Sequence, residues 1–298
     1  MTVYREILCQ SACNEVHSRF LPYRWDLNCY RGCTHGCRYC FAMYSHAYLA
    51  SDAFFGEVFV KTNLPDRLER FLRRPSWSRE VINLGGVTDN YQHAEAKYRL
   101  MPEILKLLIR YRTPCILSSK SDLILRDFEL IDQLSRLTYV NIAQTVTTMD
   151  ESVRARLEPG GAPSARRMAV LRAFAGTNAS VGVHLMPMIP HLTDSAASLE
   201  AVYAAAKEAG AQYVLANPLN LRGRTRTAFF RFLRADFPGL EPELRALYAQ
   251  GGLDKTYRAG MARRVAALQQ QYGLSANYMR FAREKMPPAE DFQQLSLF

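Results

Sequence analysis

Short apolar runs alternate with longer amphipathic segments over most of this 298-residue chain. Such alternation is typical of β-strands that are each followed by a helix, an arrangement that builds a parallel sheet. We predict short strands at residues 56–61, 81–84, 115–118, 139–145, 180–186 and 213–216. We predict helices at residues 65–73, 94–112, 127–137, 163–175 and 193–209. About six strand–helix units are fewer than a closed eight-stranded barrel needs, so the predicted α/β sheet is open or incompletely curled.

Strand signals stop near residue 221, and the rest of the chain is predicted to be helical and basic. We therefore divide the chain into an N-terminal segment (1–25), a strand–helix core (26–220) and a basic helical C-terminal extension (221–298). The formal net charge of the whole chain is +10. A positive excess of this size favours a polyanionic partner such as nucleic acid over a neutral small molecule.

The C-terminal extension opens with arginines that alternate with phenylalanines. Cationic groups beside exposed aromatic rings suit single-stranded nucleic acid or a flipped base. We therefore predict contact with DNA or another nucleic acid through Arg222, Arg224, Arg226, Arg231 and Arg234, with Phe229, Phe230 and Phe232 as stacking rings. The alternative is a solvated helix whose apolar side chains face the core, which the helical spacing of Phe229, Phe230 and Leu233 also fits.

The N-terminus has no basic region followed by an apolar run, so no secretory signal is expected. No uncharged apolar stretch is long enough to span a bilayer. The seven cysteines are an odd number, and four of them lie within residues 29–40. This favours metal chemistry in a reducing compartment over a disulfide framework. We therefore expect a cytoplasmic protein without membrane contact.

Three of these cysteines, Cys33, Cys37 and Cys40, lie within eight residues. One short loop with this spacing can wrap a polynuclear metal centre. A [4Fe–4S] cube normally takes four thiolates, so three from one loop leave one iron free to bind and activate another molecule. The alternative is a structural zinc site, which needs four ligands. Its fourth ligand would be Cys29, His35 or His46.

Polar residues follow several of the predicted strands. Parallel β/α proteins place their ligand sites at the carboxyl ends of strands, so these residues are expected to line one site. Gly85 and Gly86 would let the backbone approach a ligand closely and offer carbonyl groups to an amine. Lys120 supplies a positive charge for a carboxylate. The predicted cofactor site is completed by Thr88, Gln144 and Thr147. The alternative is a tight glycine turn and a surface lysine.

Four segments of the sequence resemble a known family. They are residues 27–42, which contain the three cysteines, and residues 86–95, 119–122 and 156–159. Together they resemble the spore photoproduct lyase-like family of radical S-adenosylmethionine (SAM) proteins, over most of residues 1–220. The resemblance implies a partial (β/α)6 TIM-like barrel. It also implies an enzyme whose [4Fe–4S] cluster, held by Cys33, Cys37 and Cys40, cleaves SAM to a 5′-deoxyadenosyl radical.

The resemblance implies roles for other residues around the cluster. Gly85 and Gly86 would receive the amino group of SAM, and Thr88 and Lys120 would contact SAM. Tyr39 would pack near the adenine and help to relay a hydrogen atom. A reducing partner such as flavodoxin or ferredoxin would supply the electron.

Two positions depart from the pattern of the lyase. The cysteine that returns a hydrogen atom in the lyase is replaced by Gly86, and the second tyrosine of its relay is replaced by Phe41. Lyase activity proper therefore needs another donor. Of the four remaining cysteines, which include Cys9 and Cys13, we predict Cys29 as the thiol nearest the site. Cys115 opens a predicted strand and is expected to be a small buried residue.

The sequence leaves three functions open. The first, which the charge and the resemblance favour, is a radical SAM enzyme that acts on nucleic acid, as in DNA repair by a photoproduct lyase. The second is a radical SAM enzyme that modifies a small molecule or a peptide. The third is a non-catalytic nucleic-acid-binding protein stabilised by zinc.

Overall fold

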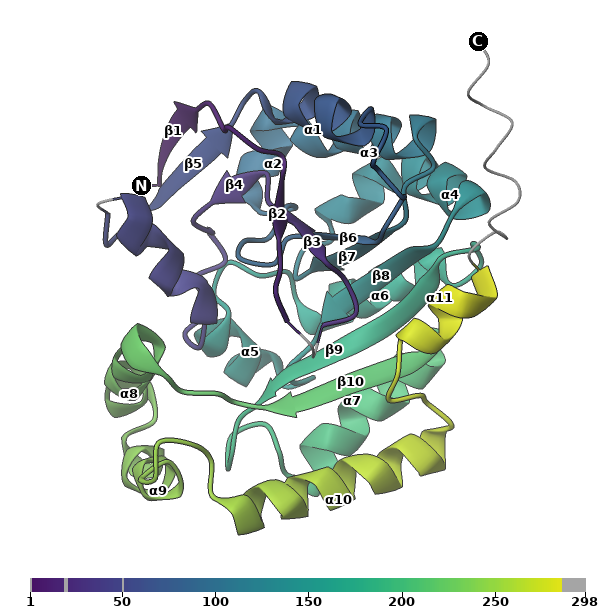
Figure 1. Ribbon diagram of the computed structural model, residues 1–298. Helices are drawn as coiled ribbons and strands as arrows, with labels where there is room; N and C mark the ends of the chain where they lie inside the picture. Colours follow the sequence, from purple (N-terminus) through teal and green to yellow (C-terminus); the bar gives the residue numbers. More distant parts are fainter. Residues whose placement is uncertain (1, 19–20, 50, 286–298) are drawn as a thin grey trace.

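A curled seven-stranded sheet with helices on its outer side forms the centre of the molecule (Figure 1). The structure is a computed structural model that describes residues 2–18, 21–49 and 51–285. The parallel strands are β3 (Trp25–Leu27), β6 (Ile82–Leu84), β7 (Cys115–Ser119), β8 (Val140–Thr145), β9 (Ser180–Met188) and β10 (Tyr213–Pro218), neighbours in this order. The short strand β2 (Cys13–Glu15) runs antiparallel to β3 at one edge. This arrangement confirms the α/β fold and the partial (β/α)6 barrel.

The central barrel strands β6, β7 and β8 are buried on both faces along almost their whole length, which is why they appear in the sequence as nearly continuous apolar runs. All six residues of β8 are buried. Val140 and Ile142 pack in the main apolar core. Asn141, between them, faces the opposite side, where it donates a hydrogen bond to the hydroxyl of Tyr213 on β10. The interior of the barrel is therefore partly polar.

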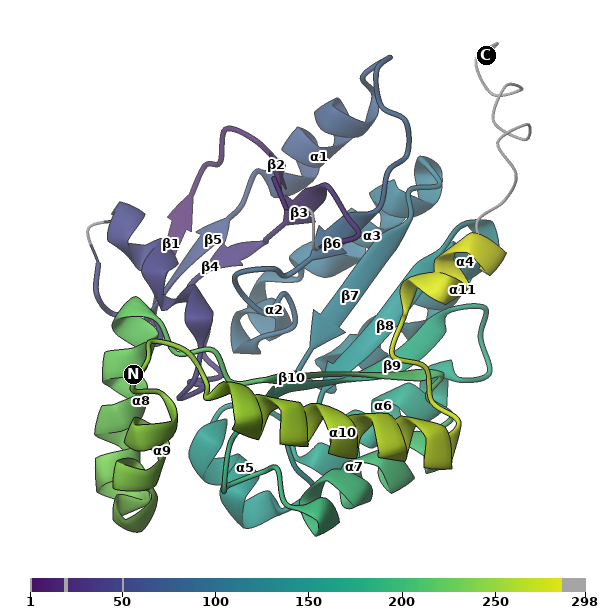
Figure 2. The same ribbon diagram turned by 60° about the horizontal axis from the view of Figure 1, so that its bottom comes forward.

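Helices follow the strands as the alternation predicts (Figure 2). The outer side carries α1 (Leu64–Leu72), α3 (Leu100–Arg110), α4 (Phe128–Leu137), α6 (Ser164–Phe174) and α7 (Ala196–Glu208). The single helix predicted at 94–112 is instead two helices, α2 (His93–Tyr98) and α3. They are separate because Arg99 adopts a left-handed backbone conformation, with φ of +49°. The sequence did not predict the short helix α5 (Glu151–Leu157), which the side chain of Asp150 caps.

A second sheet of three strands lies beside the barrel. Its order is β1 (Val3–Ile7), β5 (Glu57–Lys61) and β4 (Tyr30–Arg31). The strand predicted at 56–61 exists as β5, but it pairs with β1 and β4 and takes no part in the barrel. The first barrel strand is β3, which we did not predict because its three residues, with Asp26 in the middle, form no apolar run.

The described part of the C-terminal extension is helical, and its first helix begins at Gly223, close to the predicted boundary. It contains α8 (Gly223–Asp236), α9 (Glu241–Leu247), α10 (Lys255–Tyr272) and α11 (Met279–Lys285). α8 lies against the short helix η1 (Phe41–Leu49), and α10 lies along α7 and β10 (Figures 1 and 2). None of the described helices is long and apolar enough to cross a membrane.

The predicted stacking role of the phenylalanines in α8 is wrong. Phe229, Phe230 and Phe232 are buried in an apolar cluster. In that cluster they pack against Leu219, Leu244 and Tyr248. The rings therefore attach α8 to the protein, because burying a large aromatic surface contributes strongly to stability. The alternative, a helix whose phenylalanines face the core, is the observed one.

We predict that Phe229→Ala lowers the free energy of unfolding by about 3–5 kcal/mol, because the substitution removes a fully buried ring. Chemical denaturation followed by circular dichroism measures this change. Arg231→Ala on the same helix is the matched control, since its side chain is exposed, and should change the stability by less than about 0.5 kcal/mol. Equal stability of the two variants would contradict the burial of the ring.

Candidate active site

A cleft of about 1710 Å³ opens at the carboxyl ends of the barrel strands. Residues in or directly after the barrel strands line it together with the cysteine loop; they include Gly85, Lys120, Thr145, His184 and Asn217. Pockets for one ligand usually have a volume of about 300–1,000 Å³. The cleft therefore has room for a cofactor and a second molecule.

The cysteine loop joins β4 to η1 at this cleft. Cys33, Cys37 and Cys40 carry free thiols, and all three residues line the cleft. Gly32 and Gly36 adopt φ angles of +83° and +67°, which allow the loop to turn tightly. Three soft thiol ligands on one loop beside a large cavity fit a [4Fe–4S] cluster that keeps one iron for a further ligand.

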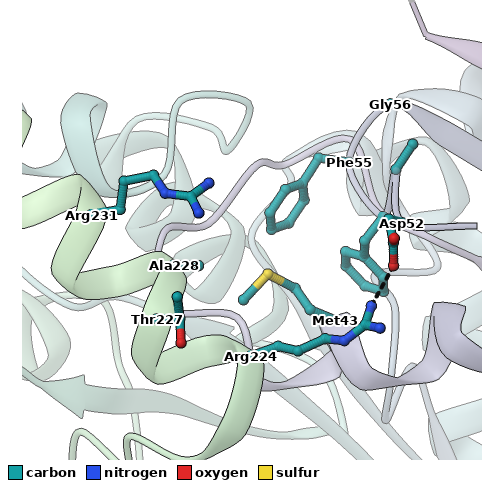
Figure 3. A pocket seen from close by; sticks show the side chains of 10 residues that line it. Met43, Asp52, Phe55, Gly56, Arg224, Thr227, Ala228 and Arg231 are labelled. Atoms are coloured by element: carbon teal, nitrogen blue, oxygen red, sulfur yellow. Dashed lines mark hydrogen bonds and ion pairs between the residues drawn. The ribbon is translucent and has the colours of Figure 1, made fainter.

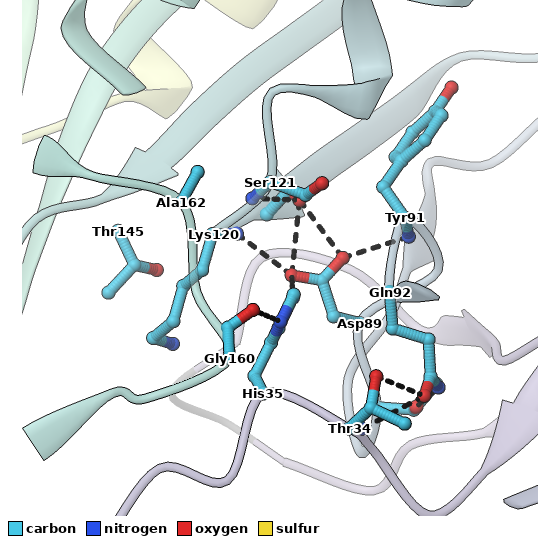
Figure 4. Close-up of polar contacts among 12 residues, drawn as sticks. Thr34, His35, Asp89, Tyr91, Gln92, Lys120, Ser121, Thr145, Gly160 and Ala162 are labelled. Carbon is cyan, nitrogen blue, oxygen red and sulfur yellow. Dashed lines mark hydrogen bonds and ion pairs between the residues drawn. The ribbon is translucent and has the colours of Figure 1, made fainter. Parts of the chain in front are cut away.

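One buried carboxylate ties the cysteine loop to the barrel (Figure 4). Nε2 of His35 lies 2.9 Å from an oxygen of Asp89, and Nδ1 lies 2.9 Å from the carbonyl oxygen of Gly160. Asp89 also accepts hydrogen bonds from the Ser119 hydroxyl and the Lys120 backbone amide at the end of β7. Burial raises the pKa of Asp89, but His35 and the hydrogen-bond donors outweigh it and lower the pKa to about 2. The carboxylate is therefore ionised at neutral pH and holds three segments together.

Gln92 adds a second connection, between the same loop and the start of α2 (Figure 4). Its amide nitrogen donates to the carbonyl oxygen of Gly32 at 3.0 Å, and its amide oxygen accepts from the backbone of Thr34 at 3.0 Å. The Thr88 hydroxyl also donates to the Gly32 carbonyl oxygen, at 2.6 Å. Thr88 thus lines the cleft as predicted, while its hydroxyl fixes the cysteine loop.

A second buried carboxylate lies beside the aromatic residue of the loop. The Tyr39 hydroxyl donates a hydrogen bond to Oε1 of Glu158, and the Thr147 hydroxyl donates to the same oxygen at 3.1 Å. Arg167, which is fully buried, pairs with the other oxygen of Glu158. Burial and the charge of Glu158 raise the pKa of Tyr39 well above its usual range. The ring of Tyr39 lines the cleft, but its hydroxyl is held by Glu158, which favours a packing role over the hydrogen relay.

The structure brings most of the predicted site residues together. The cleft that holds the three cysteines is also lined by Tyr39, Gly85, Gly86, Thr88 and Lys120. Two predicted cofactor residues do not line it. Gln144 is fully buried and donates to the backbone carbonyl of Ser121 at 3.3 Å, and Thr147 belongs to the network around Glu158.

The prediction that Cys29 lies nearest the site is wrong. Side chains alternate along the extended chain here, so Asp26 and Asn28 line the cleft while Leu27 and Cys29 face the core. The thiol of Cys29 lies 3.7 Å from the sulfur of Met101, and burial raises its pKa well above the usual range. The other candidate donors do not line the cleft either; they are Cys9, Cys13 and Cys115.

Residue 86, where the resemblance places the lyase's hydrogen donor, has no room for a side chain here. A Cβ atom at Gly86 would lie 2.5 Å from both carboxylate oxygens of Asp26. Asp26 is held in place by the Gly86 amide at 3.1 Å and by the side-chain amides of Asn28 and Asn83 at 2.6 and 2.7 Å. A carboxylate thus occupies the space that the missing thiol would need.

His184 on β9 is a neutral polar group in the wall of the cleft. It is buried, and its Nε2 has no hydrogen-bond partner among the described residues. Burial and the charge of Lys120 lower the pKa of His184 to about 4. The ring lies near Tyr213 and Tyr278, with centroids 6.1 and 6.2 Å away.

Sequence reasoning missed four residues that shape this site: Asp26, Lys61, Asp89 and Glu158. Asp89 and Glu158 lie within segments that carry the family resemblance, so their position was visible but their role was not. Asp26 and Lys61 are charged residues within short strands and are buried in the fold. A charge inside a predicted strand is the signal that could have found Lys61, whereas Asp26 lies in a strand that the sequence did not predict.

The radical SAM superfamily model matches residues 27–201. This chain belongs to the radical SAM superfamily. Members of the superfamily use a [4Fe–4S] cluster and SAM. The chain is 38% identical over 280 residues to an uncharacterized protein of Mycobacterium tuberculosis, a match that covers 92% of this chain and 82% of the relative. It is 26% identical over 171 residues to an uncharacterized protein of Methanocaldococcus jannaschii, and this match covers 57% of this chain and 62% of the relative.

Among solved structures, this radical SAM protein is similar to spore photoproduct lyase complexed with dinucleoside spore photoproduct. The TM-score is 0.59 at 11% sequence identity. The match covers 79% of this chain and 66% of the lyase chain, so this chain spans slightly less than two thirds of the lyase. At this identity, the similarity establishes the fold alone.

Two of the three residues proposed as the fourth zinc ligand are engaged elsewhere in this radical SAM protein, and the third, His46, has only its Nδ1 without a hydrogen-bond partner among the described residues. Both ring nitrogens of His35 face oxygen acceptors, and Nε2 of His46 lies 3.1 Å from the backbone oxygen of Glu57. Cys29 faces the core. Over the described residues, no three His, Cys, Asp or Glu side chains are grouped so as to hold a single metal ion.

We predict that Tyr39→Phe retains turnover but lowers the free energy of unfolding by about 1–3 kcal/mol, because Glu158 loses a buried donor. SAM cleavage and thermal unfolding of the same reconstituted protein measure the two effects. Loss of turnover with an intact cluster would instead support a hydrogen relay through the hydroxyl.

We predict that His184→Gln makes the protein less sensitive to mild acid. Because the folded-state pKa of His184 is lowered to about 4, the unfolded chain binds a proton first as the pH falls below about 6.5. The wild type therefore loses stability between about pH 6.5 and 4, by about 2 kcal/mol at pH 5 from this group. Denaturation at pH 7.5 and 5 measures the loss, which the variant should not have. An equal loss in both proteins would mean that His184 is not held neutral.

Proposed function

We propose that this radical SAM enzyme acts on nucleic acid and removes a base lesion, in the manner of a photoproduct lyase. The charge of the cleft is the observation that carries the proposal. Its lining contains the cations Arg31, Lys61, Lys120, Arg222 and Arg224. The only carboxylates among the described lining residues are Asp26 and Asp89, and Asp89 already faces His35. A positive cleft of this kind attracts phosphate groups.

The arginines at the start of α8 and along it do not support the proposal equally. Arg222 is exposed at the cleft and makes no ion pair with any described residue. Arg224 and Arg231 border a smaller cavity of about 680 Å³, where Arg224 pairs with Asp52 (Figure 3). Arg226 lies over the ring of Phe230, and Arg234 pairs with Glu241. We therefore assign the main contact with nucleic acid to Arg222, with Arg224 and Arg231 as neighbours.

The residues present would divide the chemistry as follows. Cys33, Cys37 and Cys40 would hold the cluster, and Gly85, Gly86 and Lys120 would hold SAM. When bound, these cofactors supply a 5′-deoxyadenosyl radical that abstracts a hydrogen atom from the substrate. The chain contributes position: the His35–Asp89 contact and the Tyr39–Glu158 contact fix the loop that carries the thiols.

The return of a hydrogen atom needs a donor other than a thiol at residue 86. Among the described residues, the cysteines that line the cleft are those of the cluster loop. Phe41, at the position of the lyase's second relay tyrosine, lines the cleft without a hydroxyl group. The proposal therefore covers hydrogen abstraction from a damaged base, with a hydrogen source outside this set. A flavodoxin or ferredoxin as electron donor, and a cytoplasmic location, stay predictions from the sequence.

A small-molecule or peptide substrate is the second candidate. It is favoured by the burial of the three phenylalanines, which removes the base-stacking surface that we expected on α8. The two candidates differ in their response to salt. Binding of nucleic acid through phosphate contacts weakens steeply as salt rises.

We predict that the protein, purified without oxygen and reconstituted with iron and sulfide, forms 5′-deoxyadenosine from SAM after reduction with dithionite. Chromatography measures the product. Cys37→Ala should abolish it, because the cluster loses a ligand. Cys115→Ala is the matched control, since this buried cysteine does not line the cleft, and should retain the product.

The enzyme should remove base lesions from UV-irradiated DNA in this assay. Unirradiated DNA is the control and should stay unchanged. Binding to the irradiated DNA should weaken from low to high salt. Product formation without any change in the DNA, together with salt-insensitive binding, would contradict a nucleic-acid substrate and favour the small-molecule candidate.

A further inference from the structure

Lys61, the last residue of β5, is a buried ammonium group in the wall of the cleft. Its side chain is 5% exposed, and Nζ donates a hydrogen bond to the backbone oxygen of Asn28 at 2.7 Å. An ammonium carries three N–H donors, so two remain. Lys61 forms no ion pair with any described residue. A buried charge without a counterion is costly, which makes an unpaired lysine at a cleft a marker for a ligand.

Asp26 is close to Lys61 but does not neutralise it by contact. Asn28 lies between them: its side-chain amide donates to Asp26, and its backbone oxygen accepts from Lys61. The carboxylate of Asp26 takes two further hydrogen bonds, from Asn83 and from the Gly86 amide. The hydrogen bonds of Asp26 are therefore all made to neighbouring residues of the cleft wall. The two free N–H groups of Lys61 remain available to another molecule.

Arg31, on the neighbouring strand β4, adds a second cation to this part of the cleft. It is half-buried, lines the cleft, and makes no hydrogen bond or ion pair through its side chain with any described residue. Its charge lies close enough to Lys61 to lower the pKa of that lysine, in addition to the larger effect of burial. Two cations on adjacent strands, neither in contact with a carboxylate among the described residues, create a local positive field that favours the binding of an anion.

We propose that Lys61 and Arg31 form a subsite that binds a phosphate group of the substrate inside the cleft. This inference rests on the proposed function, which supplies the phosphate as part of a nucleic acid. The carboxylate of SAM is assigned to Lys120, which follows another strand, β7, so the Lys61–Arg31 pair is available for a second anion. A guanidinium beside an ammonium suits phosphate, because the guanidinium donates two parallel hydrogen bonds and the ammonium adds a point charge.

The test compares two probes that differ only in charge. The unreduced, reconstituted protein with SAM is titrated with the dinucleotide TpT and with its methylphosphonate analogue, whose linkage is neutral. The wild type should bind TpT more tightly, by about tenfold to a hundredfold, since hydrogen bonds to a charged group are lost in the analogue. Lys61→Met should remove this difference, and Arg31→Gln should reduce it.

Lys106→Met is the matched control, because Lys106 is an exposed lysine on α3 that pairs with Glu103. It should leave the difference between the probes unchanged. Equal affinity of the wild type for both probes would overturn the subsite. So would a Lys61→Met variant that loses affinity for both probes equally, because the residue would then act on the fold of the cleft and not on the charge.

Inorganic phosphate tests the subsite without nucleic acid. Phosphate should raise the melting temperature of the wild type, and Lys61→Met should lose most of this increase; an equal concentration of acetate shows whether a carboxylate does the same. Phosphate stabilisation that depends on Lys61, in a protein that binds no dinucleotide, would support the subsite while the nucleic-acid function fails. No effect of Lys61→Met with phosphate or with TpT would overturn the inference whatever the function.

Discussion

The carboxylate of Asp89 is the contact on which the geometry of this site depends. The loop of residues 32–40, with three cysteines and two left-handed glycines, contains no regular helix or strand to hold its shape. Asp89 supplies the missing constraint, since it receives His35 from the loop and the Ser119 and Lys120 donors from the next strand. These hydrogen bonds fix the position of the loop relative to the ends of β6 and β7. A ligand that binds between the thiols and those strand ends is therefore positioned relative to both.

Glu158 has the corresponding role on the other side of the loop. It lies at the end of α5, it is fully buried, and Arg167 compensates its charge. Two ionised carboxylates in the interior would be destabilising without such partners. Both are fully partnered here, and together they leave the cleft itself predominantly positive. The carboxylate of Glu158 thus lies outside the cleft lining and that of Asp89 is paired with His35, so the charges that a substrate meets in the lining are mainly positive.

The sequence predicted the parts of this fold that depend on local pattern. The strands β6 to β10 were recognisable because most of their residues are buried, and the three cysteines because their spacing has few other uses. β3 and α5 were not, since three and seven residues carry too little periodicity. Cys29 and Phe229 show a different limit. Spacing along the chain predicted Cys29 near the cluster and Phe229 on a nucleic-acid surface. The direction in which each side chain points is instead decided by tertiary packing. Asp26 and Lys61 are brought to either side of Asn28 only by that packing, so no short stretch of sequence reveals their relationship.

The close approach of Asp26 to the backbone of Gly86 couples two positions that are 60 residues apart. A side chain at residue 86 would meet the Asp26 carboxylate at its observed position, so a thiol can be added there only if the side chain of residue 26 moves or is replaced. A change of hydrogen donor at residue 86 is therefore coupled to a change at residue 26.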